Sequence, residues 1–156
     1  RRNRLVARSE FRNPHSYMPS PFHTSRLVEF HDTDMAGIMH FASFFVYMES
    51  AEHELLRSLG LSVHARLEDE HISFPRVNAT CNYSSPARCE EILEIDVAVA
   101  RIGTKSVTYE FRFTRAGAEI ATGSMTAVCC TVAAGKPPVS RPIPPEIVEK
   151  LRTYAA

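Results

Sequence analysis

The clearest pattern of apolar positions along the chain has the period of a helix. Apolar side chains recur at steps of three and four residues from Phe41 to Leu59, with charged residues between them. This spacing places one apolar stripe along a helix of about 18 residues, which is about 27 Å long at 1.5 Å per residue. Gly60 follows the last apolar position and is typical of a helix C-terminus.

The second half of the chain alternates apolar and polar residues with a period of two. Such alternation predicts strands with one buried face. Residues 102–105 supply a turn between two of these strands, and Pro75 interrupts another. In chain order, the expected strands cover residues 24–32, 72–84, 91–101, 106–115 and 119–132.

These elements together predict an α+β fold. A single long amphipathic helix must bury its apolar stripe against another element. Strands joined by short turns pair antiparallel, so a curved antiparallel sheet wrapped around the helix would bury both. The proline-rich stretch 137–145 is expected to connect this body to a short C-terminal helix over 145–154.

The length of 156 residues fits one domain. Residues 1–21 contain Pro14, Pro19 and Pro21 without a clear period, which predicts a flexible N-terminal segment ahead of one domain over 22–156. The basic, polar start has no apolar core of a signal peptide and no initiator methionine, so we expect a trimmed or truncated start and a cytoplasmic protein. No run approaches the roughly 20 apolar residues of a membrane span.

Composition argues against several classes of protein. The 18 basic and 18 acidic side chains cancel, so nucleic acid is not expected as the main partner. The four cysteines form no Cys-x-x-Cys pair and the histidines show no metal spacing, so we expect reduced thiols and no metal site. The absence of a phosphate-cradling glycine motif and of a Gly-x-Ser-x-Gly elbow argues against a nucleoside-triphosphate enzyme and an α/β serine hydrolase.

The segment from Glu29 to Phe41, EFHDTDMAGIMHF, carries the most chemical information. It contains Asp-x-Asp-x-x-Gly, two apolar residues and then, after one further position, an aromatic residue that leads into the long helix. This order resembles the signature of the 4-hydroxybenzoyl-CoA thioesterase family of the hotdog superfamily. The likeness continues through the helix and the turn from Arg101 to Ser106 into the last strand, and so covers roughly residues 24–133. It implies the hotdog fold and acyl-CoA thioesterase activity.

The resemblance assigns Asp34 as the nucleophile or as the general base that activates water. A carboxylate has the chemistry for either role. The resemblance also implies that the backbone N–H of Phe41 polarises the thioester carbonyl, and the first N–H groups of a helix do lack partners within it. Gly37 allows the chain to turn closely between them. The local sequence by itself favours a turn-capping role for Asp34, and the full signature reverses that preference.

The expected contacts with the acyl group come from the start of the long helix. One branch of the family has a histidine where this chain has Phe41, whereas here the histidine comes one residue earlier, so it is expected at the rim of the site. Another hotdog branch uses a helix glutamate, for which Glu49 and Glu52 are the candidates. The predicted acyl contacts are His40, Phe44, Tyr47, Met48 and Glu49.

Coenzyme A is expected at the turn between two strands. By resemblance, Arg101, Lys105 and Ser106 contact its nucleotide and phosphates, and Lys136 and Arg141 extend the cationic patch. No cofactor is implied beyond the coenzyme A of the substrate. The resemblance also implies a homodimer or homotetramer in which each active site lies between two subunits.

Two other functions remain open at this level. One is a hotdog hydratase or dehydratase acting on acyl-carrier substrates, which needs a histidine paired with an acid from the other subunit in motifs that this sequence does not show. The other is a non-catalytic acyl-CoA binding protein. The sequence does not specify whether the acyl group is aromatic, short or long.

Overall fold

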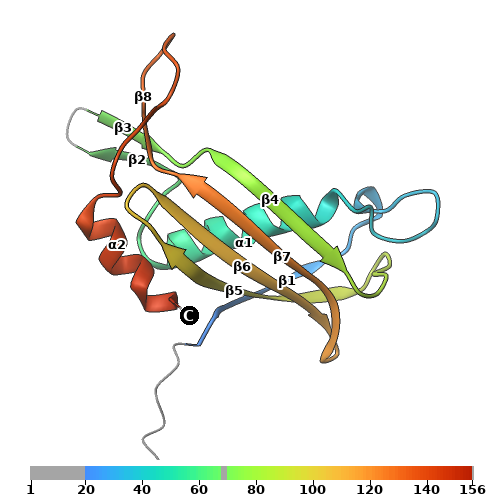
Figure 1. Cartoon of the computed structure of the whole chain (residues 1–156). Helices are drawn as coiled ribbons and strands as arrows, with labels where there is room; N and C mark the ends of the chain where they lie inside the picture. The colour runs from blue at the N-terminus through green and yellow to red at the C-terminus, as the bar shows by residue number, and fades with distance from the viewer. Residues whose placement is uncertain (1–19, 68–69, 156) are drawn as a thin grey trace, which may run out of the picture.

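The computed structural model describes residues 20–67 and 70–155, with only the backbone described at 64–67 and 70. A long helix lies against one face of an antiparallel sheet (Figure 1). The elements in chain order are β1 (Phe22–Leu27), the 3₁₀ helix η1 (Phe30–Asp32), α1 (Ser43–Ser58), β2 (His64–Leu67), β3 (Glu70–Ser73), β4 (Arg76–Tyr83), β5 (Ile92–Ile102), β6 (Ser106–Arg115), β7 (Ala118–Val128), β8 (Cys130–Val132), β9 (Val139–Ser140), α2 (Pro145–Leu151) and the 3₁₀ helix η2 (Arg152–Tyr154).

The main sheet has five strands in the order β1-β5-β6-β7-β4, and all neighbours in it are antiparallel. A smaller sheet, β2-β3-β8-β9, continues from one end of it. Side chains along β5, β6 and β7 alternate between buried and more exposed positions, so one face of the main sheet is covered. This arrangement confirms the predicted hotdog architecture.

The core lies between α1 and the covered face of the sheet. Met48, Ala51 and Leu55 on α1 are fully buried, and Phe44 packs edge-to-face on Phe113 of β6 at 5.3 Å between ring centroids. Each large apolar side chain buried in this way contributes about 1.5–3 kcal/mol relative to exposure. The helix ends as predicted, because Gly60 follows it with φ of +65°, a backbone conformation that suits glycine.

Several element boundaries differ from the prediction for local reasons. The first strand ends at Leu27, because η1 forms where residues 24–32 were expected to stay extended. The helix α1 begins at Ser43 rather than near Phe41, which lies in the preceding turn. The last predicted strand divides at Cys129, whose N–H donates to the carbonyl of Lys105, so that β7 joins the main sheet and β8 the small one.

Two further boundaries concern the chain ends. The C-terminal helix α2 stops at Leu151 and the chain continues as η2 to Tyr154, within the predicted range. The predicted flexible segment 1–21 falls mostly on residues 1–19, which lie outside the described part of the chain. Within the described residues, neither helix has the length and apolar character needed to cross a membrane.

The helix α1 packs closely on the sheet at Gly123 of β7. A Cβ atom at this position would lie 2.3 Å from Sδ of Met48 and 3.1 Å from the carbonyl oxygen of Thr80. Gly123→Ala is therefore expected to lower the free energy of unfolding by about 1–3 kcal/mol, because a packed core resists added volume. Thermal unfolding measures the effect. The exposed-face neighbour Ser124→Ala is the control and should unfold close to wild type; an unchanged melting temperature for Gly123→Ala would contradict this packing.

Candidate active site

The segment between η1 and α1 is a tight loop with Asp34 at its base. Thr33 and Met39 form an antiparallel bridge. Inside it, the N–H of Asp34 donates to the carbonyl of Ile38 at 3.0 Å, and the N–H of Gly37 donates to the carbonyl of Asp34 at 2.9 Å. Gly37 has φ of +70°, which a side chain would strain. The glycine in the sequence signature therefore closes this turn.

The first acid of the Asp-x-Asp pair is a structural residue. Asp32 is 6% exposed, and its Oδ2 accepts hydrogen bonds from the Tyr47 hydroxyl at 2.6 Å and the Glu29 N–H at 3.0 Å. Its carbonyl accepts from the His40 N–H at 2.7 Å and the Ser43 hydroxyl at 3.1 Å. Asp32 thus holds both ends of the loop against the first turns of α1.

The second acid has a different environment. Asp34 is exposed, and its Oδ1 accepts the N–H of Ala36 at 2.8 Å, a turn-capping interaction. In the described part of the chain, its Oδ2 has no hydrogen-bond partner. The turn-capping and catalytic interpretations are therefore compatible: one oxygen fixes the carboxylate, and the other is available to a ligand.

Asp34 lines a cleft of about 460 Å³ beside the start of α1. Most of the wall is apolar, so it suits an apolar group. The lining residues are Asp34, Ile38, Met39, Phe41, Phe44, Tyr83, Ser84, Ser85, Pro86 and Ala87.

The turn that leads into α1 carries an unused donor on a residue that lines the same cleft. In the described structure, the N–H of Phe41 has no acceptor, and the N-cap residue Ala42 provides no side-chain cap. The N–H of Ala42 donates instead to Nδ1 of His40 at 3.2 Å. The partial positive charge at this helix end favours an oxygen that gains negative charge. A carboxylate and a potential oxyanion donor therefore border one cleft.

The structure places only some of the other predicted acyl contacts at the cleft. Phe44 lines the cleft. Tyr47 is buried with its hydroxyl donated to Asp32, and Met48 is fully buried against Gly123. His40 lies beside the cleft, with its ring 4.4 Å from that of Phe41 between centroids.

The remaining predicted contacts lie away from the cleft of the same subunit. Glu49 is exposed on α1, 3.9 Å from Arg76 of β4. Arg101, Lys105 and Ser106 lie at the turn between β5 and β6. The cleft borders the opposite end of the sheet, about 30 Å away along an 11-residue strand. Lys105 Nζ donates to the hydroxyl of Ser140 at 3.4 Å, near the segment that also contains Lys136 and Arg141.

Sequence reasoning missed the wall of the cleft that follows β4. Tyr83, Ser84, Ser85, Pro86 and Ala87 form it, and the N–H of Met39 donates to the carbonyl of Ala87 at 2.7 Å. Nothing in the periodicity of 72–84 indicates that its end meets the loop of Asp34. The only sequence signal is the change from an alternating strand to Ser-Ser-Pro, which indicates a loop.

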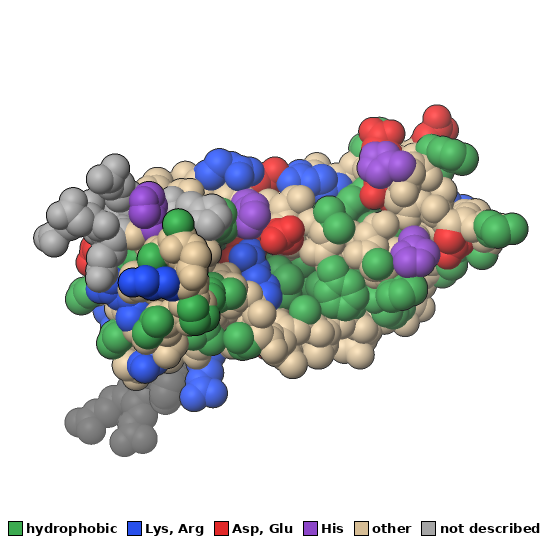
Figure 2. Space-filling model, turned by 90° about the horizontal axis from the view of Figure 1, so that it is seen from above, with side chains coloured by type: hydrophobic (Ala, Val, Ile, Leu, Met, Phe, Trp, Pro, Cys, Tyr) green, Lys and Arg blue, Asp and Glu red, His purple; other side chains and the backbone are tan. Residues whose placement is uncertain are grey.

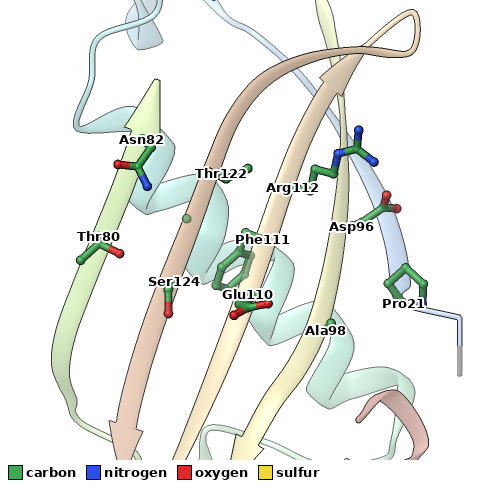
Figure 3. A pocket seen from close by; sticks show the side chains of 11 residues that line it. Pro21, Thr80, Asn82, Asp96, Ala98, Glu110, Phe111, Arg112, Thr122 and Ser124 are labelled. Carbon is green, nitrogen blue, oxygen red and sulfur yellow. The ribbon is translucent and has the colours of Figure 1, made fainter. Parts of the chain in front are cut away.

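A larger hollow, of about 550 Å³, lies over the outer face of the main sheet (Figure 3). Thr80, Ser124, Glu110 and Arg112 project there from neighbouring strands. We favour the smaller cleft as the active site, because backbone N–H groups inside a sheet are used by the neighbouring strands and cannot polarise a carbonyl.

Figure 2 shows the molecule from above the view of Figure 1. Hydrophobic side chains gather in the middle of this face, between charged and histidine side chains. The exposed apolar residues of α1, of β4 and of the turn before α1 are Phe41, Val46, Val77 and Tyr83.

Among the described residues, no cluster of His, Cys, Asp and Glu is suited to a metal ion.

The fold is that of a hotdog protein, and the relatives that the chain matches are thioester hydrolases. The profile of the Thioesterase-like superfamily matches residues 28–151, and the chain belongs to that superfamily. A candidate esterase of Aquifex aeolicus is 31% identical over 132 residues, which is 85% of this chain and 98% of that protein.

Two further relatives carry substrate names. A 1,4-dihydroxy-2-naphthoyl-CoA hydrolase of Synechococcus elongatus is 26% identical over 105 residues, which is 67% of this chain and 77% of that protein. The solved structure of a gentisyl-coenzyme A thioesterase is 29% identical, with a TM-score of 0.72, and the match covers 83% of this chain and 98% of that one.

Proposed function

We propose that the chain hydrolyses an acyl- or aroyl-CoA thioester to the free acid and coenzyme A, with Asp34 as its catalytic carboxylate. One observation carries the proposal: among the described residues, a carboxylate with a free oxygen and an unpartnered N–H in the turn before α1 belong to residues that line the same cleft. A thioester carbonyl placed between them has its carbon facing the carboxylate and its oxygen facing the donor.

Two reaction routes for hydrolysis fit this geometry. In the first, Asp34 attacks the carbonyl carbon, the C–S bond breaks, and water then hydrolyses the mixed anhydride. In the second, Asp34 takes a proton from water as the water oxygen attacks the carbon. In both routes the Phe41 N–H stabilises the tetrahedral oxyanion, and the departing thiolate takes up a proton to give coenzyme A. His40 lies beside Phe41 but is not among the residues that line the cleft.

A second copy of the chain is proposed to complete the site by pairing along β4. β4 is an eight-residue strand at the margin of the main sheet, and Val77 on it is 63% exposed. A long edge strand with exposed apolar residues is suited to pair with another strand. Antiparallel pairing of two β4 strands reverses the ends of the sheet between subunits. The partner's Arg101, Lys105 and Ser106 would then lie at the end that holds this subunit's cleft, where coenzyme A needs them.

Val77→Lys is expected to weaken this pairing, because it places a charge on the edge strand. Light scattering after gel filtration should show a shift towards monomer, and the turnover of acyl-CoA should fall at least about tenfold as the sites lose their second wall. Val139→Lys is the matched control, since Val139 is equally exposed but belongs to β9. A monomeric Val77→Lys with full activity would remove the shared site from the proposal.

The relatives favour an aromatic acyl group, because two of them are named for aroyl-CoA substrates. The apolar cleft wall, with the rings of Phe41, Phe44 and Tyr83, suits a flat ring as well as a short chain. A free-thiol assay across aromatic, short-chain and long-chain acyl-CoAs tests the function. Release of coenzyme A from at least one class is expected, with aroyl-CoA preferred. Binding without release across the panel would favour an acyl-CoA binding protein instead.

A further inference from the structure

Phe41, whose N–H is the candidate oxyanion donor, makes few contacts of its own. The side chain of Phe41 is 60% exposed, so burial does not fix it. The carbonyl of Phe41 accepts no hydrogen bond from the helix backbone, because the N–H of Phe45, four residues later, donates to the carbonyl of Ala42 at 3.1 Å. A donor at the edge of a cleft is useful in catalysis only when its direction is fixed before the substrate arrives.

The carbonyl of Phe41 accepts a hydrogen bond from a tyrosine of β4 instead. The hydroxyl of Tyr83, at the end of β4, donates to the carbonyl of Phe41 at 3.1 Å. The ring of Tyr83 packs edge-to-face on Phe44 at 5.2 Å, and Phe44 packs in the same way on Phe113 in the core. The hydroxyl is thereby connected to the rigid sheet, and Tyr83 also lines the cleft.

We infer that Tyr83 is a positioning residue for the reaction: by holding the carbonyl of Phe41 it fixes the peptide that follows this residue, and so limits the directions that the Phe41 N–H can take at the edge of the cleft. Three other hydrogen bonds fix the same turn from within the loop: the His40 N–H donates to the Asp32 carbonyl, the Ala42 N–H donates to His40 Nδ1, and the Ser43 N–H donates to the His40 carbonyl, which belongs to the same peptide as the Phe41 N–H. Tyr83 supplies the only one of these contacts that comes from the sheet. It therefore aligns the donor in the turn before α1 with the wall formed by β4. This inference rests on the proposed function.

The Tyr83 hydroxyl is protonated, and so it can donate a hydrogen bond. Burial raises the pKa of its hydroxyl to about 12, and the nearby Cys81 thiol adds to the shift. The hydroxyl thus keeps its proton at neutral pH. Other groups that face the turn are Asp34 on the same cleft and His40 on the loop.

Tyr83→Phe removes the hydroxyl and keeps the ring against Phe44. We expect kcat to fall about 5- to 20-fold while KM changes less than about twofold, because the lost contact affects the alignment of the donor more than substrate binding. The shape of the pH–rate profile should stay the same. The control is Tyr154→Phe, which removes a hydroxyl that lies 3.4 Å from Ser58 Oγ, away from the cleft, and should leave kcat unchanged.

A measurement without substrate makes the test independent of the reaction. The amide of Phe41 in a ¹H–¹⁵N spectrum should shift and exchange with solvent faster in Tyr83→Phe, with the oligomeric state of wild type. Three results would overturn the inference: an unchanged Phe41 amide with unchanged kcat, loss of the alkaline limb of the pH profile, which would make Tyr83 a proton donor, or a rise in KM alone. If no thioester is hydrolysed by wild type, the proposed function fails, and the amide measurement still decides whether Tyr83 holds the turn.

Discussion

Asp34→Asn is expected to lower kcat for acyl-CoA hydrolysis at least about a hundredfold, since an amide is neither a nucleophile nor a base under these conditions. The fold should be retained, because Asp34 is exposed and an asparagine oxygen can still accept the N–H of Ala36. The measurement is a free-thiol assay on purified variant and wild type, with far-ultraviolet circular dichroism to check the fold.

The neighbouring acid provides the matched control. Asp32→Asn keeps one oxygen for the buried contacts but loses the charge that the Tyr47 hydroxyl and the Glu29 N–H bind. We expect it to lower the melting temperature and to leave more activity per folded molecule than Asp34→Asn. The reverse order, with Asp34→Asn near wild-type turnover, would transfer the catalytic role away from Asp34.

The elements of the fold could largely be predicted from the sequence because their signals are periodic. The strand 106–115 was predicted with the bounds that the structure shows, since Val107, Tyr109, Phe111 and Phe113 alternate without interruption. The break at Pro75 correctly separates β3 from β4. The short strands β2 and β9 were missed, because four or fewer residues are too few to establish a period.

The candidate site could be predicted only in part, because a cleft depends on pairings that lie far apart in sequence. Asp34, Gly37 and Phe41 belong to one continuous motif, and the structure places them in one loop. Tyr83 reaches this loop only through the register of β4 with β7 and the packing of the sheet on α1. Likewise, no local pattern reveals that Tyr47 is committed to Asp32 rather than to a ligand.

A buried ion pair between α1 and β4 gives the second large effect. Glu52 is 1% exposed, and its Oε2 accepts from Nη2 of Arg76 at 2.6 Å. Within the described residues, the other carboxylate oxygen of Glu52 and Nε of Arg76 are buried without partners. Arg76 also donates to the carbonyl of Phe74 at 3.1 Å and lies 3.2 Å from His53 Nε2. The pair is therefore poorly solvated and incompletely satisfied by hydrogen bonds.

Arg76→Met is expected to lower the free energy of unfolding by about 3–5 kcal/mol, because it leaves the carboxylate of Glu52 buried without its counter-charge. The melting temperature should fall on the order of 10 °C for a chain of this size. Thermal and urea unfolding at one fixed protein concentration measure the loss. In the double variant, with Glu52→Met added, most of the loss should be recovered, because two apolar side chains of similar volume need no counter-charge.

The loss of stability in Arg76→Met is expected to increase with pH. Burial raises the pKa of Glu52 above its usual value, against the opposing effect of Arg76. Removing Arg76 raises that pKa further. A carboxyl group with a raised pKa in the folded state favours folding in its protonated form. The free energy of unfolding therefore falls as the pH rises from the pKa of the unfolded chain to the raised pKa of the folded protein. Arg76→Met should therefore approach wild-type stability as the pH is lowered and differ most at pH values above the raised pKa of Glu52. A stability difference that is constant with pH, or a double variant no more stable than Arg76→Met, would mean that lost packing and not the stranded charge causes the effect.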